Sequence, residues 1–211
     1  TLLKPTATPD DIAAHCEEAV EYGFAADCIP PVYVQMASDA LYGSDVAVAT
    51  VVGFPLGYET AAVKSFQAQR AVAAGASELD MVINLGAAEA GHLDLVEQDI
   101  SAVVAASGSA RVKVILECCL FSSERKARLA EIAVKAGADY VKTSTGFSTG
   151  GATIEDVTLL AKAVSGHAGV KAAGGIRDVE ACRQMIAAGA TRIGTSAGVQ
   201  IVKDWLASGA G

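Results

Sequence analysis

Two lysines stand at the ends of short apolar segments of the kind that form buried β-strands. Lys142 ends the segment Asp-Tyr-Val-Lys, and Lys171 ends Gly-Val-Lys; small residues and glycine follow each of them at once. An amine held in a poorly solvated site beside a second cation loses its proton readily, and a neutral amine attacks carbonyl carbon. The pattern predicts either carbonyl chemistry, or two lysines that pair with buried carboxylates such as Asp80 or Glu117 and only brace the fold.

The repulsion between two such lysines is large enough to matter. At a separation of about 6 Å and an effective dielectric constant of about 20, two ammonium groups repel each other by roughly 2.8 kcal/mol. This energy corresponds to a lowering of a lysine pKa by about two units, and so to a neutral fraction about a hundredfold higher at neutral pH. A carboxylate close by opposes this effect, and the sequence leaves the balance open.

Asp80 is a candidate for that carboxylate. It lies within Leu-Asp-Met-Val-Ile, where an unpaired charge would be costly to bury. One interpretation makes it a proton-transfer and hydroxyl-binding group that faces the lysines. The other makes it the ion-pair partner of one lysine, and the two interpretations are compatible.

The rest of the chain alternates strand-like and helical segments. The phrase Ala-Gly-Ala recurs around Gly75, Gly137 and Gly189, where glycine would end a helix just before a strand begins. Counting five residues on from each glycine gives Asp80, Lys142 and Gly194, which predicts similar depths in three strands. Eight strands are expected, at 1–3, 24–29, 46–52, 78–83, 112–117, 140–143, 170–172 and 192–194. Eight helices are expected, at 9–21, 32–41, 60–74, 93–106, 123–136, 153–164, 179–188 and 199–207.

This order predicts the α/β class and a single domain over residues 1–211. The strands are continuously apolar, which is typical of a parallel sheet covered by helices. Eight units favour a closed, parallel eight-stranded (β/α)₈ TIM barrel, with an additional N-terminal helix and a first strand that is partly truncated. Asp178 is expected to cap one helix, and Thr153 with Asp156 resembles a capping box.

Glycine-rich turns follow the last two expected strands, where barrels of this class commonly bind phosphate. Each turn leads into a helix N-terminus, whose free N–H groups attract anions. The substrate- and phosphate-binding candidates are Gly174, Gly175, Gly194, Ser196, Thr145 and Cys28. Cys28 ends the second expected strand, and we expect it to pack beside the site rather than to react in catalysis.

Composition excludes several classes of partner and cofactor. A formal net charge of −8 argues against nucleic acid or an anionic membrane surface, and no apolar stretch approaches the length of a membrane span. Five cysteines without a C-x-x-C pair are typical of a reduced, cytoplasmic protein. His15, His92 and His167 lack partners at metal-ligand spacing, so we expect no metal and no cofactor.

These segments together resemble deoxyribose-phosphate aldolase. The matching stretches follow one another in order along almost the whole chain: Thr-Leu-Leu-Lys-Pro from Thr1, Thr-Val-Val-Gly-Phe-Pro from Thr50, Glu-Leu-Asp-Met-Val-Ile-Asn from Glu78, Lys-Val-Ile-Leu-Glu from Lys113, Val-Lys-Thr-Ser-Thr-Gly-Phe from Val141, Gly-Gly-Ala-Thr from Gly150, Lys-Ala-Ala-Gly-Gly-Ile-Arg from Lys171, and Arg-Ile-Gly-Thr-Ser-Ala-Gly from Arg192.

The resemblance implies a class I aldolase without a metal, acting on 2-deoxy-D-ribose 5-phosphate. Lys142 corresponds to the imine-forming lysine, Lys171 to the lysine that perturbs it, and Asp80 to the acid/base carboxylate. The glycine-rich turns correspond to the phosphate site. A small sugar phosphate is the expected partner, and the resemblance is compatible with a homodimer.

The chain departs from the family in three places. Members usually carry an Asp-His pair before Thr-Leu-Leu, and this chain begins after that pair, as if trimmed. Some members have a lysine where this chain has Phe147, so one cation on the phosphate side is absent. Some end in a tail with a proton-transferring tyrosine, whereas this chain ends at Ala210 and Gly211.

Two other functions remain open from the residues alone. A sugar-phosphate isomerase or epimerase would use Asp80 as a base and the lysines as electrostatic clamps, without a covalent intermediate. A non-catalytic phosphate-binding module would have no need of lysines deep in strands.

Overall fold

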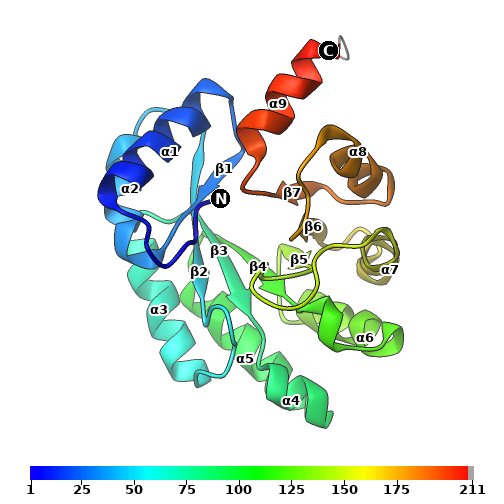
Figure 1. The fold of residues 1–211 in the computed structure, drawn as a ribbon. Coiled ribbons are helices and arrows are strands. Elements are labelled where there is room, and N and C mark those ends of the chain that lie inside the picture. The colour runs from blue at the N-terminus through cyan, green and yellow to red at the C-terminus, as the bar shows by residue number, and fades with distance from the viewer. Residues whose placement is uncertain (209–211) are drawn as a thin grey trace.

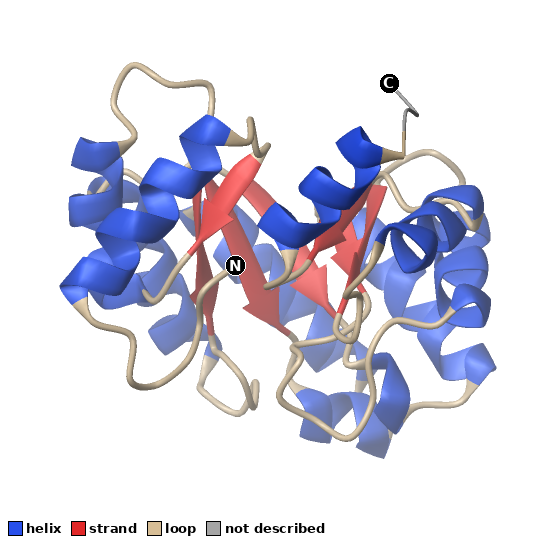
Figure 2. Ribbon diagram, turned by 45° about the horizontal axis from the view of Figure 1, so that its top comes forward, coloured by secondary structure: helices blue, strands red, loops and turns tan. Residues whose placement is uncertain are grey.

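The computed structural model describes residues 1–208, in which parallel strands form one curved sheet inside a ring of helices (Figure 1). Within these residues seven strands pair in chain order. They are β1 (Ala26–Cys28), β2 (Ala47–Val52), β3 (Glu78–Val82), β4 (Arg111–Ile115), β5 (Tyr140–Lys142), β6 (Gly169–Ala173) and β7 (Arg192–Gly194). Figure 2 shows the strands pointing the same way between the flanking helices. Ala210 and Gly211, with which the family's tail was compared, lie outside the described residues.

The helices cover the outer face of the sheet. They are α1 (Pro9–Glu21), α2 (Val34–Ala40), α3 (Ala61–Ala73), α4 (Leu85–Ala90), α5 (Leu93–Ala106), α6 (Ser123–Lys135), α7 (Ile154–Val164), α8 (Val179–Ala187) and α9 (Gly198–Ala207), with short 3₁₀ helices η1 (Pro31–Tyr33) and η2 (Cys118–Leu120). The eight expected helices are all present within two residues of their expected bounds. Two further helices, α4 and η2, were not predicted; each is shorter than two turns.

The expected eighth strand is not observed within the described residues. Residues 1–3 adopt no strand, although the Leu2 amide donates to Cys28 O at 2.9 Å. On the other side, the amino group of Thr1 donates to Thr195 O at 3.2 Å. The N-terminal residues therefore lie between β1 and the end of β7 without forming a ladder, because so short a segment makes one backbone bond on each side. The fold is a curved seven-stranded parallel sheet of the half-barrel type.

Helix ends follow the expected chemistry. Gly75, Gly137 and Gly189 all have positive φ, between 93° and 111°, and end their helices as the recurring Ala-Gly-Ala phrase predicted. The side chain of Asp178 accepts from the Ala181 amide at 2.8 Å, which confirms the expected N-cap of α8.

The expected capping box of α7 is only half formed. Thr153 accepts from the Asp156 amide at 3.1 Å. The Asp156 carboxylate instead pairs with Lys126 of α6 at 2.6 Å. An ion pair with the neighbouring helix thus takes the carboxylate that would have completed the box.

Strand alternation divides the interior into two regions. Leu79, Met81 and Val114 point away from the barrel axis into the large core between the sheet and the helices. A small apolar cluster on β1 and β2 forms the second region, centred on Cys28, Ala49 and Val51. The inward positions of β3 to β6 carry charges instead: Glu78, Asp80, Lys113, Lys142 and Lys171, all buried. One part of the concave side of the curved sheet is therefore an apolar wall, and the other part is an ionic wall.

Candidate active site

Asp80 on β3 is the centre of the ionic wall. Its side chain is fully buried, and it accepts hydrogen bonds from three lysine ammonium groups. Oδ2 receives Lys142 Nζ at 2.7 Å and Lys171 Nζ at 2.6 Å, and Oδ1 receives Lys113 Nζ at 2.8 Å. The two lysines that the sequence analysis singled out share one oxygen atom, so their amines lie within two hydrogen-bond lengths of each other.

Asp80, Lys142 and Gly194, for which the sequence predicted similar depths, lie at three different levels of the strand register. Lys142 pairs directly with Lys171, whereas Asp80 pairs with Lys113, which pairs with Tyr140. Asp80 therefore lies one inward position before Lys142, and Gly194 one inward position after Lys171. The strands of a twisted, curved sheet are rotated relative to one another, so residues at different register levels approach each other across its concave side.

Lys113 on β4 belongs to the cluster, and the sequence analysis did not identify it as a site residue. Besides Asp80 it pairs with Glu78 Oε2 at 2.7 Å. Lys113 lies in Val-Lys-Val-Ile, so the rule that found Lys142 and Lys171, a lysine inside an apolar strand, could have found it.

Glu78, one inward position before Asp80, anchors the lower end of the cluster. Arg192 of β7 bonds both of its oxygens, at 2.9 and 3.2 Å, which is the bidentate geometry that suits a guanidinium. The Arg192 guanidinium also lies over the ring of Tyr140, 5.7 Å from its centroid. A continuous set of charges thus runs from Arg192 through Glu78 and Lys113 to Asp80.

The pKa values of the cluster are shifted by burial and by this excess of cations. Burial alone would raise the pKa of Asp80, but Lys142, Lys171 and Lys113 together hold it well below its ordinary range. Burial lowers the pKa of Lys171; Asp80 opposes this effect, and the charge of Lys142 adds to it. Burial also acts to lower the pKa of Lys113, but Asp80 and Glu78 outweigh it and raise that pKa. Lys171 is therefore a buried amine that gives up its proton more readily than an ordinary lysine.

The alternative that the lysines are simply paired is thus correct as a description of contacts. Both lysines pair with Asp80 and not with Glu117, whose carboxylate bonds the Thr145 amide and hydroxyl. Pairing of two ammonium groups with one oxygen leaves a surplus positive charge, and this is the condition that the carbonyl-chemistry hypothesis requires.

Glu117 fixes the loop that follows Lys142. It is one of two non-glycine residues at positive φ within residues 1–208, at φ 55°, a conformation that costs roughly 1–2 kcal/mol. Its buried carboxylate receives the Thr145 hydroxyl at 2.5 Å. The same hydroxyl accepts the Phe147 amide at 3.0 Å, so both functions of the Thr145 side chain have partners inside the protein.

The glycine-rich turns lie where the sequence predicted, at the ends of β6 and β7. Gly174 and Gly175 have φ values of 91° and 80°, which side chains rarely adopt. Gly174 also lies against Gly151, whose neighbour Ala152 donates its amide to Gly174 O at 3.0 Å. Two loops therefore meet at this turn, and a side chain at either glycine would separate them.

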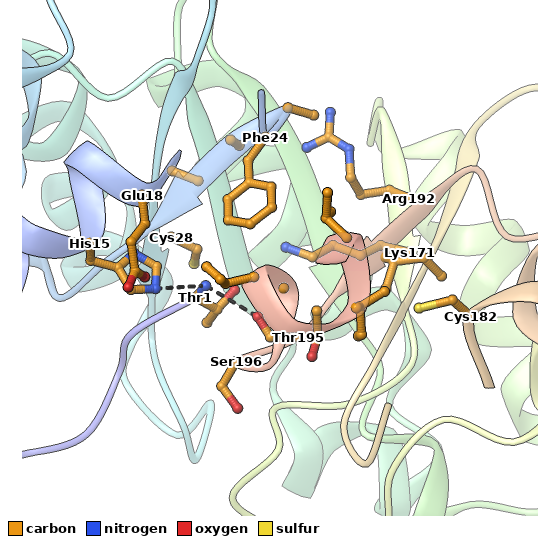
Figure 3. A pocket seen from close by; sticks show the side chains of 18 of the residues that line it. Thr1, His15, Glu18, Phe24, Cys28, Lys171, Cys182, Arg192, Thr195 and Ser196 are labelled. Carbon is orange, nitrogen blue, oxygen red and sulfur yellow. Dashed lines mark hydrogen bonds between the residues drawn. The ribbon is translucent and has the colours of Figure 1, made fainter. Parts of the chain in front are cut away.

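A cavity of about 350 Å³ opens between β1, β7 and α9 and reaches the ionic cluster at Lys171 (Figure 3). Cys28, Thr195 and Ser196 line this cavity together with Lys171. Burial and the charge of Asp80 raise the pKa of the Cys28 thiol, although the lysines oppose this. The thiol is therefore a poor nucleophile at neutral pH.

His15 has a structural partner instead of a metal-binding set: its Nδ1 lies 2.7 Å from Asp27 Oδ1. Among residues 1–208 no group of three histidine, cysteine, aspartate or glutamate side chains is placed to hold a metal ion. In the same residues no helix has both the length and the apolar character needed to cross a membrane.

Comparison with known proteins gives consistent matches over the whole chain. A family model described as DeoC/LacD family aldolase matches residues 1–206. Two proteins named deoxyribose-phosphate aldolase are similar: one from Geobacillus sp. (strain WCH70), 58% identical over 96% of this chain and 92% of its own length, and one from Streptococcus gordonii (strain Challis), 54% identical over 99% and 95%.

Solved structures of deoxyribose-phosphate aldolases are also similar to this chain. A putative deoxyribose-phosphate aldolase from Coccidioides immitis superposes with a TM-score of 0.95 at 44% identity, covering 96% of this chain and 81% of that one. A tetrameric deoxyribose phosphate aldolase from Aeropyrum pernix gives a TM-score of 0.91 at 37% identity, covering 98% and 88%.

Proposed function

This chain belongs to the DeoC/LacD family of aldolases, and we propose that it reversibly cleaves 2-deoxy-D-ribose 5-phosphate to D-glyceraldehyde 3-phosphate and acetaldehyde through an imine on Lys142. One observation carries the assignment of residues: Lys142 and Lys171 share a single oxygen of a fully buried aspartate. An isomerase or epimerase would need no such pair of amines, and the relatives do not favour it.

The reaction begins with a neutral amine. Lys142 in its unprotonated form attacks the aldehyde carbon C1. The Lys171 ammonium donates the proton with which the carbinolamine hydroxyl leaves as water, so that the imine on Lys142 is protonated and Lys171 is neutral. Lys171 assists this attack because its positive charge disfavours a second positive charge on the neighbouring Lys142 amine. Its own lowered pKa lets it lose a proton and accept one during the reaction.

The protonated imine is the electron sink for breaking the C2–C3 bond. The C3 hydroxyl gives up its proton, its oxygen becomes the carbonyl of glyceraldehyde 3-phosphate, and the bonding pair moves to form an enamine on Lys142. Asp80, held ionised by three ammonium groups, accepts the hydrogen bond of that hydroxyl, and neutral Lys171 takes the proton through it. Protonation of the enamine at C2 and hydrolysis then release acetaldehyde.

We assign the substrate phosphate to the turns after β6 and β7, at Gly174, Gly175, Gly194 and Ser196. These turns lie beside Lys171, at the ends of neighbouring strands. Binding energy gained at the phosphate, away from the breaking bond, holds C1 against Lys142. Cys28 contributes to the apolar wall opposite the lysines. Thr145 holds the loop after Lys142 in place, because its hydroxyl bonds both the Glu117 carboxylate and the Phe147 amide.

Borohydride reduction tests the assignment. With acetaldehyde present, the reduced protein should carry one ethyl group on Lys142, located by mass spectrometry of the peptides. Lys142→Arg should lose both the adduct and the activity while it keeps the charge. An active wild-type protein without any adduct would favour the isomerase-type chemistry and remove Lys142 from its role.

Three further features belong to the same proposal. The N-terminal residues, bonded to Cys28 O and Thr195 O, would occupy the eighth position of a closed barrel. The five cysteines are free, which suits a cytoplasmic protein. Light scattering after size exclusion would distinguish a homodimer, with which the resemblance is compatible, from a tetramer such as that named for Aeropyrum pernix.

A further inference from the structure

Two aromatic rings meet across the mouth of the sheet. Phe54 follows β2 and Phe147 follows β5, and their ring centroids lie 5.2 Å apart with an interplanar angle of 86°. β3 and β4 stand between these two strands. The contact can form only if the loop after β5 reaches back over the ends of β3 and β4, and Figure 1 shows that loop extending inside the ring of helices.

The two rings are supported differently. Phe54 packs on the apolar wall of Cys28, Ala49 and Val51, so its position follows from the fold of β1 and β2. Phe147 is 51% exposed, and an aromatic side chain left half in water needs another reason for its position. Edge-to-face packing on Phe54 is one such reason.

The backbone supplies the second reason. The Phe147 amide donates to Thr145 Oγ1, and that hydroxyl donates to the Glu117 carboxylate. Glu117 is buried between two backbone bonds that tie the ends of β4 and β5: the Leu116 amide to Lys142 O, and the Cys118 amide to Thr143 O. The strand that carries Lys142 and the loop that carries Phe147 are thus held by the same strained residue.

We propose that Phe54 and Phe147 form an aromatic bridge that covers the β3–β4 half of the mouth and so limits the aldehydes that the site accepts, with Glu117 as its positioning residue through Thr145. The bridge leaves the site open toward the turns of β6 and β7, where the proposed function puts the phosphate. A substrate chain attached to Lys142 must therefore leave toward those turns. This inference rests on the proposed function and adds the residues that set its selectivity.

The test compares two acceptors in the aldol direction, with acetaldehyde as the donor. D-Glyceraldehyde 3-phosphate carries the phosphate, and 3-phenylpropanal is bulky and uncharged. In Phe147→Ala and in Phe54→Ala, the ratio of kcat/KM for phenylpropanal to that for glyceraldehyde phosphate should rise by about threefold to tenfold. Tyr42→Ala is the matched control, because Tyr42 is 92% exposed and lies before β2, at the opposite end of that strand from Phe54.

Two variants of Thr145 test whether Glu117 positions Phe147 through the Thr145 hydroxyl. Thr145→Val keeps the shape of the side chain but removes the hydroxyl, and the ratio should rise as in Phe147→Ala. Thr145→Ser keeps the hydroxyl and should return the ratio to that of the wild type. Equal ratios in the valine and serine variants would overturn the part assigned to Glu117 and Thr145.

The remaining outcomes separate this inference from the function on which it rests. A ratio in Phe147→Ala no higher than in Tyr42→Ala, with an ethyl adduct still trapped on Lys142, would overturn the aromatic bridge alone. Absence of the adduct in the wild type would overturn the bridge together with the proposed function.

Discussion

Gly194 leaves room for Lys171. A Cβ atom at Gly194 would lie 2.9 Å from Lys171 Cε, closer than real Cβ atoms approach other heavy atoms. The backbone of Gly194 needs no positive φ, so conformational freedom is not the reason for glycine here. The absent side chain instead lets the lysine stem pass to Asp80.

Gly194→Ala should therefore damage activity far more than stability. The end of a lysine side chain can move at a cost of about 1 kcal/mol in rotamer strain, but its Nζ would then leave Asp80. A displacement of about 1 Å in a reacting group can lower kcat by about a hundredfold. Gly86→Ala in α4 is the control, because its added Cβ would lie 3.7 Å from the nearest side-chain atom. An active Gly194→Ala protein with wild-type kcat would show that Lys171 is not held where the mechanism needs it.

Lys171→Leu should move the pH dependence of activity. The substitution removes the buried amine whose pKa burial and the charge of Lys142 lower, and with it the second positive charge at the shared oxygen, so activity should require a higher pH. The acid limb of the kcat profile should shift upward by up to about two pH units. Circular dichroism should show an intact fold, because leucine suits a site that is almost completely buried. A profile that coincides with that of the wild type would remove the electrostatic role of Lys171.

The elements could be predicted because their signals are local. Amphipathic periodicity and a glycine with positive φ at each helix end gave α3, α6 and α8 to within a residue or two. Residues 1–3 were wrongly expected to form a strand, because a short apolar segment has no local feature that shows whether a partner strand exists. α4 lacks an apolar stripe and is marked only by Asn84 at its start and Gly91 at its end.

The site could be predicted only where a residue type was out of place. Asp80, Lys142 and Lys171 are charges in apolar strands, and the structure brings all three together. The register that joins them, and the links from Lys113 to Glu78 and from Glu117 to Thr145, depend on the tilt of the strands and on one left-handed residue. Neither the tilt of the strands nor the left-handed backbone of Glu117 produces a repeating pattern that can be recognised in the sequence.

Glu78 should govern the loss of stability in acid. Lys113 and Arg192 outweigh burial and lower the pKa of Glu78 below its ordinary value of 4.5. A carboxylate with a lowered folded-state pKa stabilises the fold above its ordinary pKa, and this contribution is lost as the pH falls through the folded value. The wild type should therefore lose free energy of unfolding steadily below about pH 4.5.

Glu78→Gln isolates that contribution. At pH 7 the variant should lose about 3 kcal/mol of unfolding free energy in urea, since it leaves buried cations without their partner. Its stability should then fall less steeply in acid, so that the two curves approach each other as the pH falls through the lowered pKa of Glu78. Glu131→Gln is the control, because Glu131 is exposed on α6 and pairs only with Arg128 three residues before it. Parallel curves for the wild type and Glu78→Gln would show that another carboxylate governs acid unfolding.

Cys28 should make the protein sensitive to α,β-unsaturated aldehydes. Its thiol lines the cavity that reaches Lys171, so an aldehyde drawn to the lysines places its β-carbon near sulfur. Burial and Asp80 raise the pKa of this thiol, and the thiolate is the attacking species. Inactivation should therefore be slow at neutral pH and should accelerate as the pH rises.

Mass spectrometry locates the adduct, and two variants show its consequence. Cys28→Ala should stay active after an exposure that inactivates the wild type. Cys119→Ala should be inactivated at the wild-type rate, because Cys119 is exposed on η2 and its Sγ lies 3.5 Å from the Ser148 hydroxyl, outside the cavity. Deoxyribose 5-phosphate should protect Cys28 and leave Cys119 unprotected. Equal inactivation of Cys28→Ala and the wild type would show that the aldehyde reacts with another group. Aldehydes would then not reach the Cys28 thiol through the cavity that it lines.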